Sequence, residues 1–226
     1  MINPYYDKLK FTEEEIKKEV HRVSVGGIWE EQSNLQLNIC KKYGLTPESK
    51  FLDFGCGCFR GGVKFIEFLN KGNYYGIDVN NELMRVGVEH EIVKANLQEK
   101  LVIDNLLIND NFYVDFFGIN FDIIFAQSVF THLTLNHFDF FIQKSFNVLK
   151  TNGKLLISFW LIEEDEDITK DKIFTSDNFS IKTRYIFDAF HYKFSQLEKI
   201  IDDRWDIKLL DDYHPRKQKF ILITKK

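Results

Sequence analysis

The stretch FLDFGCGCFRGG, residues 51–62, decides how this chain should fold. It begins with a short apolar run that stops at Gly55, and four glycines fall within its last eight residues. An apolar run of this length that ends at a glycine is typical of a buried parallel strand. Glycines let the backbone approach a ligand closely, so the stretch indicates a strand, then a binding loop, then the start of a helix.

On either side of this stretch the sequence predicts alternating helices and strands. The first helix opens with Thr12, and Glu15 three residues later completes the pattern of a capping box. Strands that alternate with helices imply right-handed crossovers and a parallel sheet. In this half of the chain we expect helices at 12–23, 28–43, 61–70 and about 80–97, and strands at 51–54 and 74–78.

The second half continues the alternation and closes with two neighbouring strands. Apolar residues from Leu135 to Leu149 recur at helical spacing, which predicts an amphipathic helix that ends at Asn152 and Gly153. Another helix should begin with Ser195 as its cap. The last two strands are separated by the eight residues 211–218, too few for a helical crossover, so they should pair antiparallel. The expected strands lie at 106–109, 121–126, 154–159, 205–210 and 219–225.

Length and composition favour a single large domain. The chain has 226 residues, of which 44% are hydrophobic, and this is enough for a substantial core. We expect one domain over 1–226, whose parts are N-terminal helices at 1–50, a cofactor-binding core at 51–160, an insert at 161–194, and a closing helix and hairpin at 195–226.

Charge and hydropathy disfavour several kinds of partner. The net charge is -4 and no run of Lys and Arg exceeds two residues, so the broad basic face of a nucleic-acid binder is not indicated. The N-terminal residues lack a signal-peptide pattern, and the apolar runs are too short to span a membrane. A cytoplasmic protein is therefore expected, with its three cysteines as reduced thiols. The oligomeric state stays open.

The glycine loop departs from three common ligand-binding motifs. A dinucleotide fingerprint needs glycine at its first, third and sixth positions, and here Gly55 and Gly57 fill the first two while Arg60 occupies the sixth. The lysine of a phosphate-binding loop is missing. Cys56 and Cys58 have no second pair of ligands at metal-binding spacing, so no metal site is predicted.

Two acids point to a different ligand. Asp53 lies at the carboxyl end of the first strand, where an open α/β sheet binds its ligand. An acid at this place would repel a phosphate but suits a ligand with an amine and a sulfonium. Asp78 ends the second strand and is placed to accept both hydroxyls of a ribose.

With these residues the chain resembles the class I S-adenosylmethionine-dependent methyltransferases over about residues 28–160 and the closing hairpin. It departs from them at Phe59, where a third glycine is usual, and at Thr151 to Gly153, where Pro-Gly-Gly is usual. Three further segments are similar to a bacterial subgroup of these enzymes. They are FRGG, AQSVFTHL and HPRKQ. The segments that carry the resemblance are LDFGCGCFRGG, YYGIDVN, NDNF, FDIIFAQSVFTHL and VLKTNGKLLISF.

The resemblance implies a fold, a cofactor and a set of contacts. The fold would be a Rossmann-like α/β three-layer sandwich with a mostly parallel seven-stranded sheet and an antiparallel last strand. The cofactor would be S-adenosylmethionine, with Asp110, Asn111 or Asn109 near its adenine, and with Gln127 and Ser128 near its methionine part or the acceptor. The full set of expected cofactor contacts is Asp53, Gly55, Gly57, Arg60, Asp78, Val79, Asp110, Asn111, Gln127 and Ser128.

Two histidines are the candidates for chemistry. Methyl transfer is an in-line displacement in which the enzyme positions donor and acceptor, and a hydroxyl acceptor must also lose its proton. His132 follows the strand at 121–126, and His214 lies in the turn of the closing hairpin; both loops should open at the carboxyl edge of the sheet. We expect both as catalytic residues, with Arg216 and Gln218 of the same turn binding the substrate.

The sequence therefore predicts a methyltransferase that acts on a small-molecule or glycan acceptor, more readily at oxygen than at nitrogen. A nucleobase acceptor is disfavoured, because the strand at 121–126 runs into AQSVF and lacks the Pro-Pro-aromatic motif of such enzymes. Alternatives are an RNA or protein methyltransferase, a non-catalytic adenosylmethionine-binding module, and a nucleotide-dependent oxidoreductase.

Overall fold

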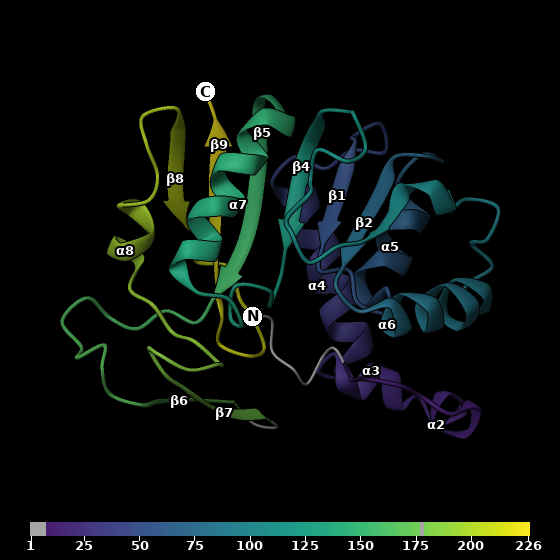
Figure 1. The fold of residues 1–226 in the computed structure, drawn as a ribbon, viewed down its shortest axis with the longest axis horizontal. Coiled ribbons are helices and arrows are strands. Elements are labelled where there is room, and N and C mark those ends of the chain that lie inside the picture. The colour runs from purple at the N-terminus through teal and green to yellow at the C-terminus, as the bar shows by residue number, and fades with distance from the viewer. Residues whose placement is uncertain (1–7, 177–178) are drawn as a thin grey trace. The chain divides into compact units, whose positions relative to one another are not determined.

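A computed structural model describes residues 8–176 and 179–226, and the chain divides into two compact units (Figure 1). Unit 1 ends at Tyr113 and unit 2 begins at Val114. A seven-stranded sheet has the strand order β3-β2-β1-β4-β5-β9-β8, and a separate two-stranded sheet holds β6 and β7. The prediction of an α/β fold with a mostly parallel sheet and an antiparallel last strand is thus confirmed. Parts of the predicted N-terminal segment and insert, residues 1–7 and 177–178, lie outside the described residues.

Unit 1 is built around three parallel strands. β1 pairs with β2, and β2 pairs with β3. All four residues of β1 are buried, and Phe51 packs against Phe65 of the following helix with 4.3 Å between ring centroids. The elements are α2 (Glu13–Lys17), α3 (Val20–Ser24), α4 (Trp29–Lys42), β1 (Phe51–Phe54), α5 (Arg60–Phe68), β2 (Tyr74–Asp78), α6 (Asn81–Val86), the π-helical turn η1 (Gly87–Ile92), the 3-10 turn η2 (Ile103–Asn105) and β3 (Leu106–Ile108).

The helix predicted at 12–23 is in fact two short helices. Its start is confirmed, because Thr12 and Glu15 form the expected capping box. Glu19 then adopts a left-handed conformation with φ 58°, which ends α2 and redirects the chain into α3. The carboxylate of Glu19 pairs with Arg22 and Lys94 at 2.8 Å each, and these ion pairs accompany the turn. A local pattern could not indicate this break, since Lys94 is far away in the sequence.

The helix predicted at about 80–97 changes into a π-helical turn after Val86. Gly87 begins this turn, and a β-carbon there would lie 2.3 Å from Cδ2 of Phe59 and 2.8 Å from the carbonyl carbon of Cys58. No side chain fits such a gap, so glycine allows the turn to pack directly on the loop after β1.

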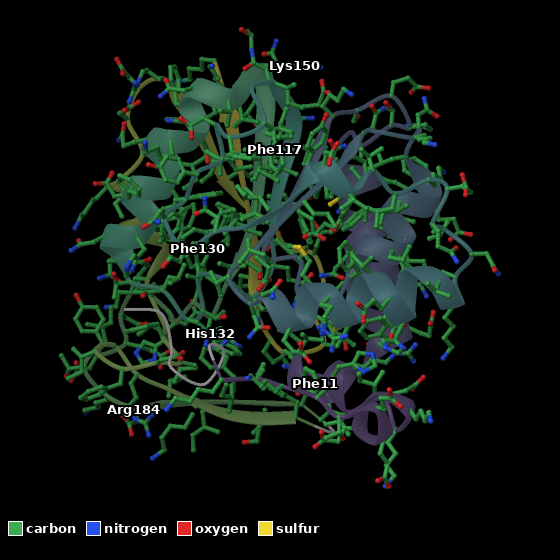
Figure 2. The ribbon with its side chains drawn as sticks, turned by 45° about the vertical axis from the view of Figure 1, so that its right-hand side comes forward. Phe11, Phe117, Phe130, His132, Lys150 and Arg184 are labelled. Carbon is green, nitrogen blue, oxygen red and sulfur yellow. The ribbon has the colours of Figure 1, made fainter. Side chains whose placement is uncertain are left out.

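Unit 2 contains the remaining strands, and Figure 1 shows β4, β5, β9 and β8 side by side. β4 and β5 are parallel, whereas β9 is antiparallel to both β5 and β8, as the short closing connection predicts. Phe130, which Figure 2 labels, has ring contacts with Phe138, Phe141 and Phe159. The elements are β4 (Phe121–Ala126), α7 (Leu135–Val148), β5 (Leu149–Phe159), β6 (Lys172–Ser176), β7 (Phe179–Thr183), α8 (Phe194–Glu198), β8 (Trp205–Leu209) and β9 (Lys219–Lys225).

Three boundaries in unit 2 differ from the prediction. α7 ends at Val148, and β5 begins at once and includes Asn152, which has a positive φ of 61°. Lys193, not Ser195, is the cap of α8, because the Ser195 hydroxyl donates instead to Glu164 at 2.6 Å. The predicted insert at 161–194 contains the antiparallel strands β6 and β7, and the charged, aperiodic stretch at 163–171 that precedes them gave no sign of these strands.

Among the described helices, none has the length and apolar character required to cross a membrane.

Candidate functional site

Left-handed backbone shapes the loop that follows β1. Gly55 has φ 84° and Gly57 has φ 54°, which glycine adopts without strain, and Phe59 has φ 65°. The amides of Gly55 and Cys56 both donate to the carbonyl of Ile77, at 2.7 and 3.0 Å. These hydrogen bonds tie the loop to the end of β2.

Asp78, the last residue of β2, is held by backbone donors at both carboxylate oxygens. The amide of Gly57 donates to Oδ2 at 2.7 Å, and the amide of Asn80 donates to Oδ1 at 2.8 Å. Burial raises the pKa of Asp78, while hydrogen bonds from the amides of Asn80, Gly57 and Val79 oppose that rise. Because a carboxylate oxygen has a second lone pair, this oriented side chain can still accept two hydroxyl groups.

Asp53 is buried at 5% exposure and accepts a hydrogen bond from the hydroxyl of Tyr74 at 3.0 Å. Burial raises the pKa of Asp53 to about 7, and the charge of Asp78 adds to the rise. The hydrogen bond from Tyr74 and the charge of Arg60 oppose it. The side chain is therefore poised to lose its proton near neutral pH when a cation comes close.

Arg60 holds the N-terminal segment against the glycine loop. Its guanidinium Nη1 donates to the carbonyl oxygens of Val25 at 2.7 Å and Gly27 at 3.3 Å. The Val25 side chain would lie 3.2 Å from a β-carbon at Gly57. Arg60 thus organises the loop by binding backbone carbonyls, and its direct contact with a cofactor stays a prediction.

The candidate adenine residues lie in the loop after β3. Asp110 and Asn111 are exposed, and the side chain of Asn109 accepts a hydrogen bond from the amide of Asn111 at 2.6 Å. Phe112 stacks on Phe54 at the end of β1, with 5.7 Å between ring centroids. Asn109 therefore orders the turn, and Asp110 is left at its surface.

A second polar cluster lies at the carboxyl end of β4 in unit 2. The amide of Ser128 donates to Ser158 Oγ at 2.8 Å, and the Ser128 hydroxyl lies 2.9 Å from Gln218 Nε2. Ser158 Oγ also donates to Gln218 Oε1 at 2.6 Å. These bonds bring the predicted residues Ser128 and Gln218 together and fasten the closing hairpin to the end of β4.

His214 joins the same cluster but is almost fully buried. Its Nδ1 accepts a hydrogen bond from the Arg216 amide at 3.1 Å, so the neutral ring carries its proton on Nε2. Nε2 lies 3.1 Å from Nε2 of the Gln127 side chain. Because a proton on the ring nitrogen needs an acceptor, we assign the Gln127 amide with its oxygen and nitrogen exchanged, so that the oxygen faces the ring. With both ring nitrogens in hydrogen bonds, His214 is better suited to hold the turn in place than to take up a proton.

His132 is more exposed, at 26% of its side chain, and follows β4 by a short turn. Its Nδ1 lies 2.6 Å from Oδ1 of Asp188. In Figure 2, His132 and Lys150 lie at opposite ends of the unit, which agrees with their places after β4 and at the start of β5. His132 is thus at the carboxyl edge of these parallel strands, as predicted from the sequence.

Arg216 is held by aromatic side chains. The indole of Trp160 donates to the carbonyl of Arg216 at 2.9 Å, and the guanidinium lies over the ring of Phe179 at 4.9 Å from its centroid. The turn is fixed further by Ser176, whose hydroxyl donates to the carbonyl of Pro215 at 2.8 Å. The β6–β7 hairpin therefore supports the turn that carries His214 and Arg216.

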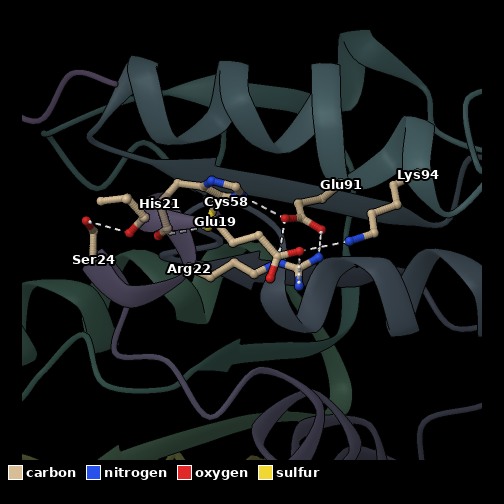
Figure 3. Close-up of polar contacts among 8 residues, drawn as sticks. Glu19, His21, Arg22, Ser24, Cys58, Glu91 and Lys94 are labelled. Atoms are coloured by element: carbon tan, nitrogen blue, oxygen red, sulfur yellow. Dashed lines mark hydrogen bonds and ion pairs between the residues drawn. The ribbon is translucent and has the colours of Figure 1, made fainter. Parts of the chain in front are cut away.

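An ion cluster in unit 1 connects α3 to η1 (Figure 3). Glu91 is buried, and it accepts hydrogen bonds from Arg22 at both oxygens, each at 2.7 Å, while His21 Nε2 lies 2.6 Å away. Burial alone would raise the pKa of Glu91, but the hydrogen bonds with His21 and Arg22 overcome it and lower that pKa to about 2. The N-terminal helices are thereby anchored beside the glycine loop, whose Cys58 thiol contacts the carbonyl of His21 at 3.7 Å.

Sequence reasoning missed the residues that support the predicted ones. Tyr74, Asp188 and Glu91 each pair with a residue at least 21 positions away, so no local spacing could reveal them. One signal was present at Tyr74, where a hydroxyl-bearing aromatic opens the strand expected to lie next to Asp53. The acidic side chains of Glu91 and Asp188 carried no comparable signal.

The seven-stranded sheet with its closing antiparallel strand, the glycine loop and the acids at the ends of β1 and β2 define a class I S-adenosylmethionine-dependent methyltransferase. Residues 27–204 match the mycolic acid cyclopropane synthetase family over most of the chain. The chain belongs to that family.

Known proteins agree with this class. Phosphoethanolamine N-methyltransferase of Plasmodium falciparum (isolate 3D7) is 31% identical over 123 residues, which are 54% of this chain and 43% of that relative. The chain thus aligns with less than half of the length of this relative.

Solved structures share the fold at low identity. Magnesium protoporphyrin IX methyltransferase of Synechocystis PCC 6803, with bound S-adenosylmethionine, has a TM-score of 0.63 at 12% identity, covering 99% of this chain and 94% of that chain. Glycopeptide N-methyltransferase MtfA with S-adenosyl-L-homocysteine has a TM-score of 0.60 at 11% identity, covering 93% and 98%. At this identity the structures show that the fold is shared. The family match over residues 27–204 supports the class of S-adenosylmethionine-dependent methyltransferases and agrees with the expected cofactor.

The described residues fit this cofactor. The oriented carboxylate of Asp78 suits a ribose, and the raised pKa of Asp53 suits a neighbouring ammonium group. Positive φ at Gly55 and Gly57 turns the loop without bulky side chains.

Proposed function

We propose that the protein methylates an oxygen of a small-molecule or glycan acceptor, with His132 as the general base. The observation that carries this proposal is the place of His132: it is a partly exposed imidazole in the turn after the carboxyl end of β4, and a carboxylate lies 2.6 Å from its Nδ1. A hydroxyl is a weak nucleophile until its proton is removed, and histidine is well suited to remove it near neutral pH.

In this scheme the glycine loop, Asp53 and Asp78 hold the cofactor, and His132 and Arg216 act on the acceptor. When bound, S-adenosylmethionine supplies an electrophilic methyl group on a sulfonium, whose bonding electron pair stays on sulfur. His132 Nε2 takes the acceptor proton. Arg216 binds a polar or anionic group of the acceptor, and Gln127 and His214 keep the turn of Arg216 in position.

A small amine is the second candidate acceptor. The relative from Plasmodium falciparum is named a phosphoethanolamine N-methyltransferase, and Arg216 would suit a phosphate on such a molecule. An RNA acceptor is less favoured, because the chain is acidic overall, with a net charge of -4.

An acceptor screen tests the proposal. The purified protein is incubated with S-adenosylmethionine and panels of sugars, small hydroxyl compounds, phosphorylated amines, RNA and peptides, and release of S-adenosylhomocysteine is measured. We expect release with a small hydroxyl or glycan acceptor, and mass spectrometry of the product should place the new methyl group on oxygen. Release with amines alone would favour the second candidate, and release with RNA or peptides alone would overturn both.

Asp78→Ala should weaken binding of S-adenosylhomocysteine by about tenfold or more. The ribose would lose hydrogen bonds to a charged acceptor, which are worth about 1.5 to 3 kcal/mol. Isothermal calorimetry measures the effect, with Asp104→Ala, an exposed acid of unit 1, as the control. Wild-type affinity in a folded Asp78→Ala protein would remove this side chain from the cofactor site.

Binding of the cofactor product should also depend on pH through Asp53. Because its pKa is raised to about 7 in the folded protein, its proton stabilises the fold fully at acidic pH, below its ordinary pKa, and this stabilisation is lost as pH rises through about 7. A bound ammonium group favours the carboxylate form of Asp53. Affinity should therefore rise with pH, by up to about tenfold per pH unit, until the pH reaches that pKa. Titrations at acidic and alkaline pH check this, and Asp53→Asn should show a flatter profile; equal profiles for both proteins would contradict it.

A further inference from the structure

The carboxylate of Asp188 faces the imidazole of His132 across two segments of unit 2. Asp188 Oδ1 lies 2.6 Å from His132 Nδ1, and both side chains are about one-quarter exposed, at 23% and 26%. Asp188 belongs to the predicted insert, to which the sequence assigned no chemistry. The pair therefore links the candidate base to a residue without an assigned role.

Backbone hydrogen bonds hold the two segments together independently of this contact. The amide of Phe190, two residues after Asp188, donates to the carbonyl of Thr131, next to His132, at 2.8 Å. The hydroxyl of Tyr192 donates to the carbonyl of Leu133 at 2.7 Å. The residues on both sides of His132 are thus fastened to the chain that carries Asp188.

The same chain is closed on itself at the base of its loop. The amide of Arg184 donates to the carbonyl of Ala189 at 2.8 Å, and the amide of His191 donates to the carbonyl of Arg184 at 3.2 Å. Asp188 therefore sits in a loop whose two ends are joined by hydrogen bonds. This geometry places the carboxylate against one ring nitrogen of His132.

The chemistry of the two groups decides where the imidazole proton lies. An ionised carboxylate only accepts hydrogen bonds, so at 2.6 Å the proton between the pair belongs to Nδ1. A neutral ring with its proton on Nδ1 has its basic lone pair on Nε2. When Nε2 takes up a second proton, the resulting imidazolium is next to a negative charge, which stabilises it.

We propose that Asp188 is the positioning residue of the methyl transfer: it selects the Nδ1–H tautomer of His132 and leaves Nε2 to take the acceptor proton. The inference rests on the proposed function of His132. In the step itself the O–H bond of the acceptor breaks, its proton moves to Nε2, and its electron pair stays on oxygen as the nucleophile. Asp188 neither gains nor loses a proton.

Two kinds of measurement test the pair, and the first needs no acceptor. The ¹⁵N chemical shifts of the His132 ring, assigned by comparison with His132→Gln, report which nitrogen carries the proton. We expect the Nδ1–H tautomer in the wild type. The control variant Asp165→Asn, which changes an exposed acid of the same insert, should show the same tautomer. In Asp188→Ala the proton should move largely to Nε2. Retention of the Nδ1–H tautomer in Asp188→Ala would overturn the proposal.

The second measurement is steady-state turnover with an accepted substrate. Asp188→Ala should lower kcat by about tenfold or more with little change in KM, because orientation of the base matters in the transition state. Asp188→Glu, which keeps the carboxylate, should recover part of kcat. If the alanine variant does not fold, Asp188→Asn replaces it in the kinetic measurement. Wild-type kcat in folded Asp188→Ala and Asp188→Asn would also overturn the proposal.

The outcomes separate the two claims. Wild-type turnover in His132→Gln would refute the proposed base, even if the tautomer measurement supports the pair. A loss of turnover in His132→Gln, without any effect of the Asp188 variants on tautomer or kcat, would refute the positioning role alone.

Discussion

Replacing His132 with glutamine should lower kcat for an oxygen acceptor by about 10²- to 10⁴-fold, the range that a positioned general base contributes. Glutamine is similar in size and polar, but it cannot take up a proton. The KM for the acceptor should change little, since the interaction that is lost forms in the transition state. Steady-state kinetics with the acceptor found in the screen measures the effect.

The control for this variant is His90→Gln. His90 is an exposed histidine in η1 of unit 1, so its replacement should leave kcat unchanged. An unchanged Tm of the His132→Gln protein would show that the loss is chemical and not due to unfolding. If His132→Gln retains wild-type kcat, His132 is not the base.

Replacing Glu91 with alanine should cost about 3 kcal/mol in the free energy of unfolding. Breaking a buried ion pair costs about 3 to 5 kcal/mol, because the remaining partners lose their counter-charge. The lower end applies, since Arg22 is 16% exposed and can still reach water. Urea denaturation measures this as a lower midpoint, and Glu89→Ala is the matched control, because its ion pair with Arg85 is exposed and worth at most about 1 kcal/mol.

The stability of the wild type and of Glu91→Ala in acid should differ as well. The pKa of Glu91 is about 2 in the folded protein, below its ordinary value, so its contribution to stability is present at neutral pH and is lost as pH falls through about 2. Wild-type stability should therefore decline in acid more steeply than that of Glu91→Ala. Equal midpoints for wild type and Glu91→Ala at neutral pH would refute the role of this cluster as an anchor.

The sequence was most informative where short-range patterns determine structure. The apolar run before Gly55 predicted β1, the acids Asp53 and Asp78 were placed at the ends of β1 and β2, and the short connection before β9 predicted its antiparallel pairing. Each of these features depends on neighbouring residues or on the length of one connection.

The rest depends on contacts between residues that are distant in the chain. The His21–Glu91 contact spans 70 positions and the His132–Asp188 contact spans 56, and neither changes the local periodicity. The left-handed Glu19 divided a helix whose pattern looked continuous. His214 was expected as a catalytic base from its place in the turn, yet its burial and its two hydrogen bonds became apparent only in the folded chain.

The central claim is that the glycine loop, with Asp53 and Asp78, binds S-adenosylmethionine. A calorimetric titration of the wild-type protein tests this claim most directly. The protein is titrated side by side with S-adenosylhomocysteine and with NAD under the same conditions. Saturable binding of S-adenosylhomocysteine, with no heat of binding from NAD, is the result we predict. Saturable binding of NAD with none of S-adenosylhomocysteine would contradict the account.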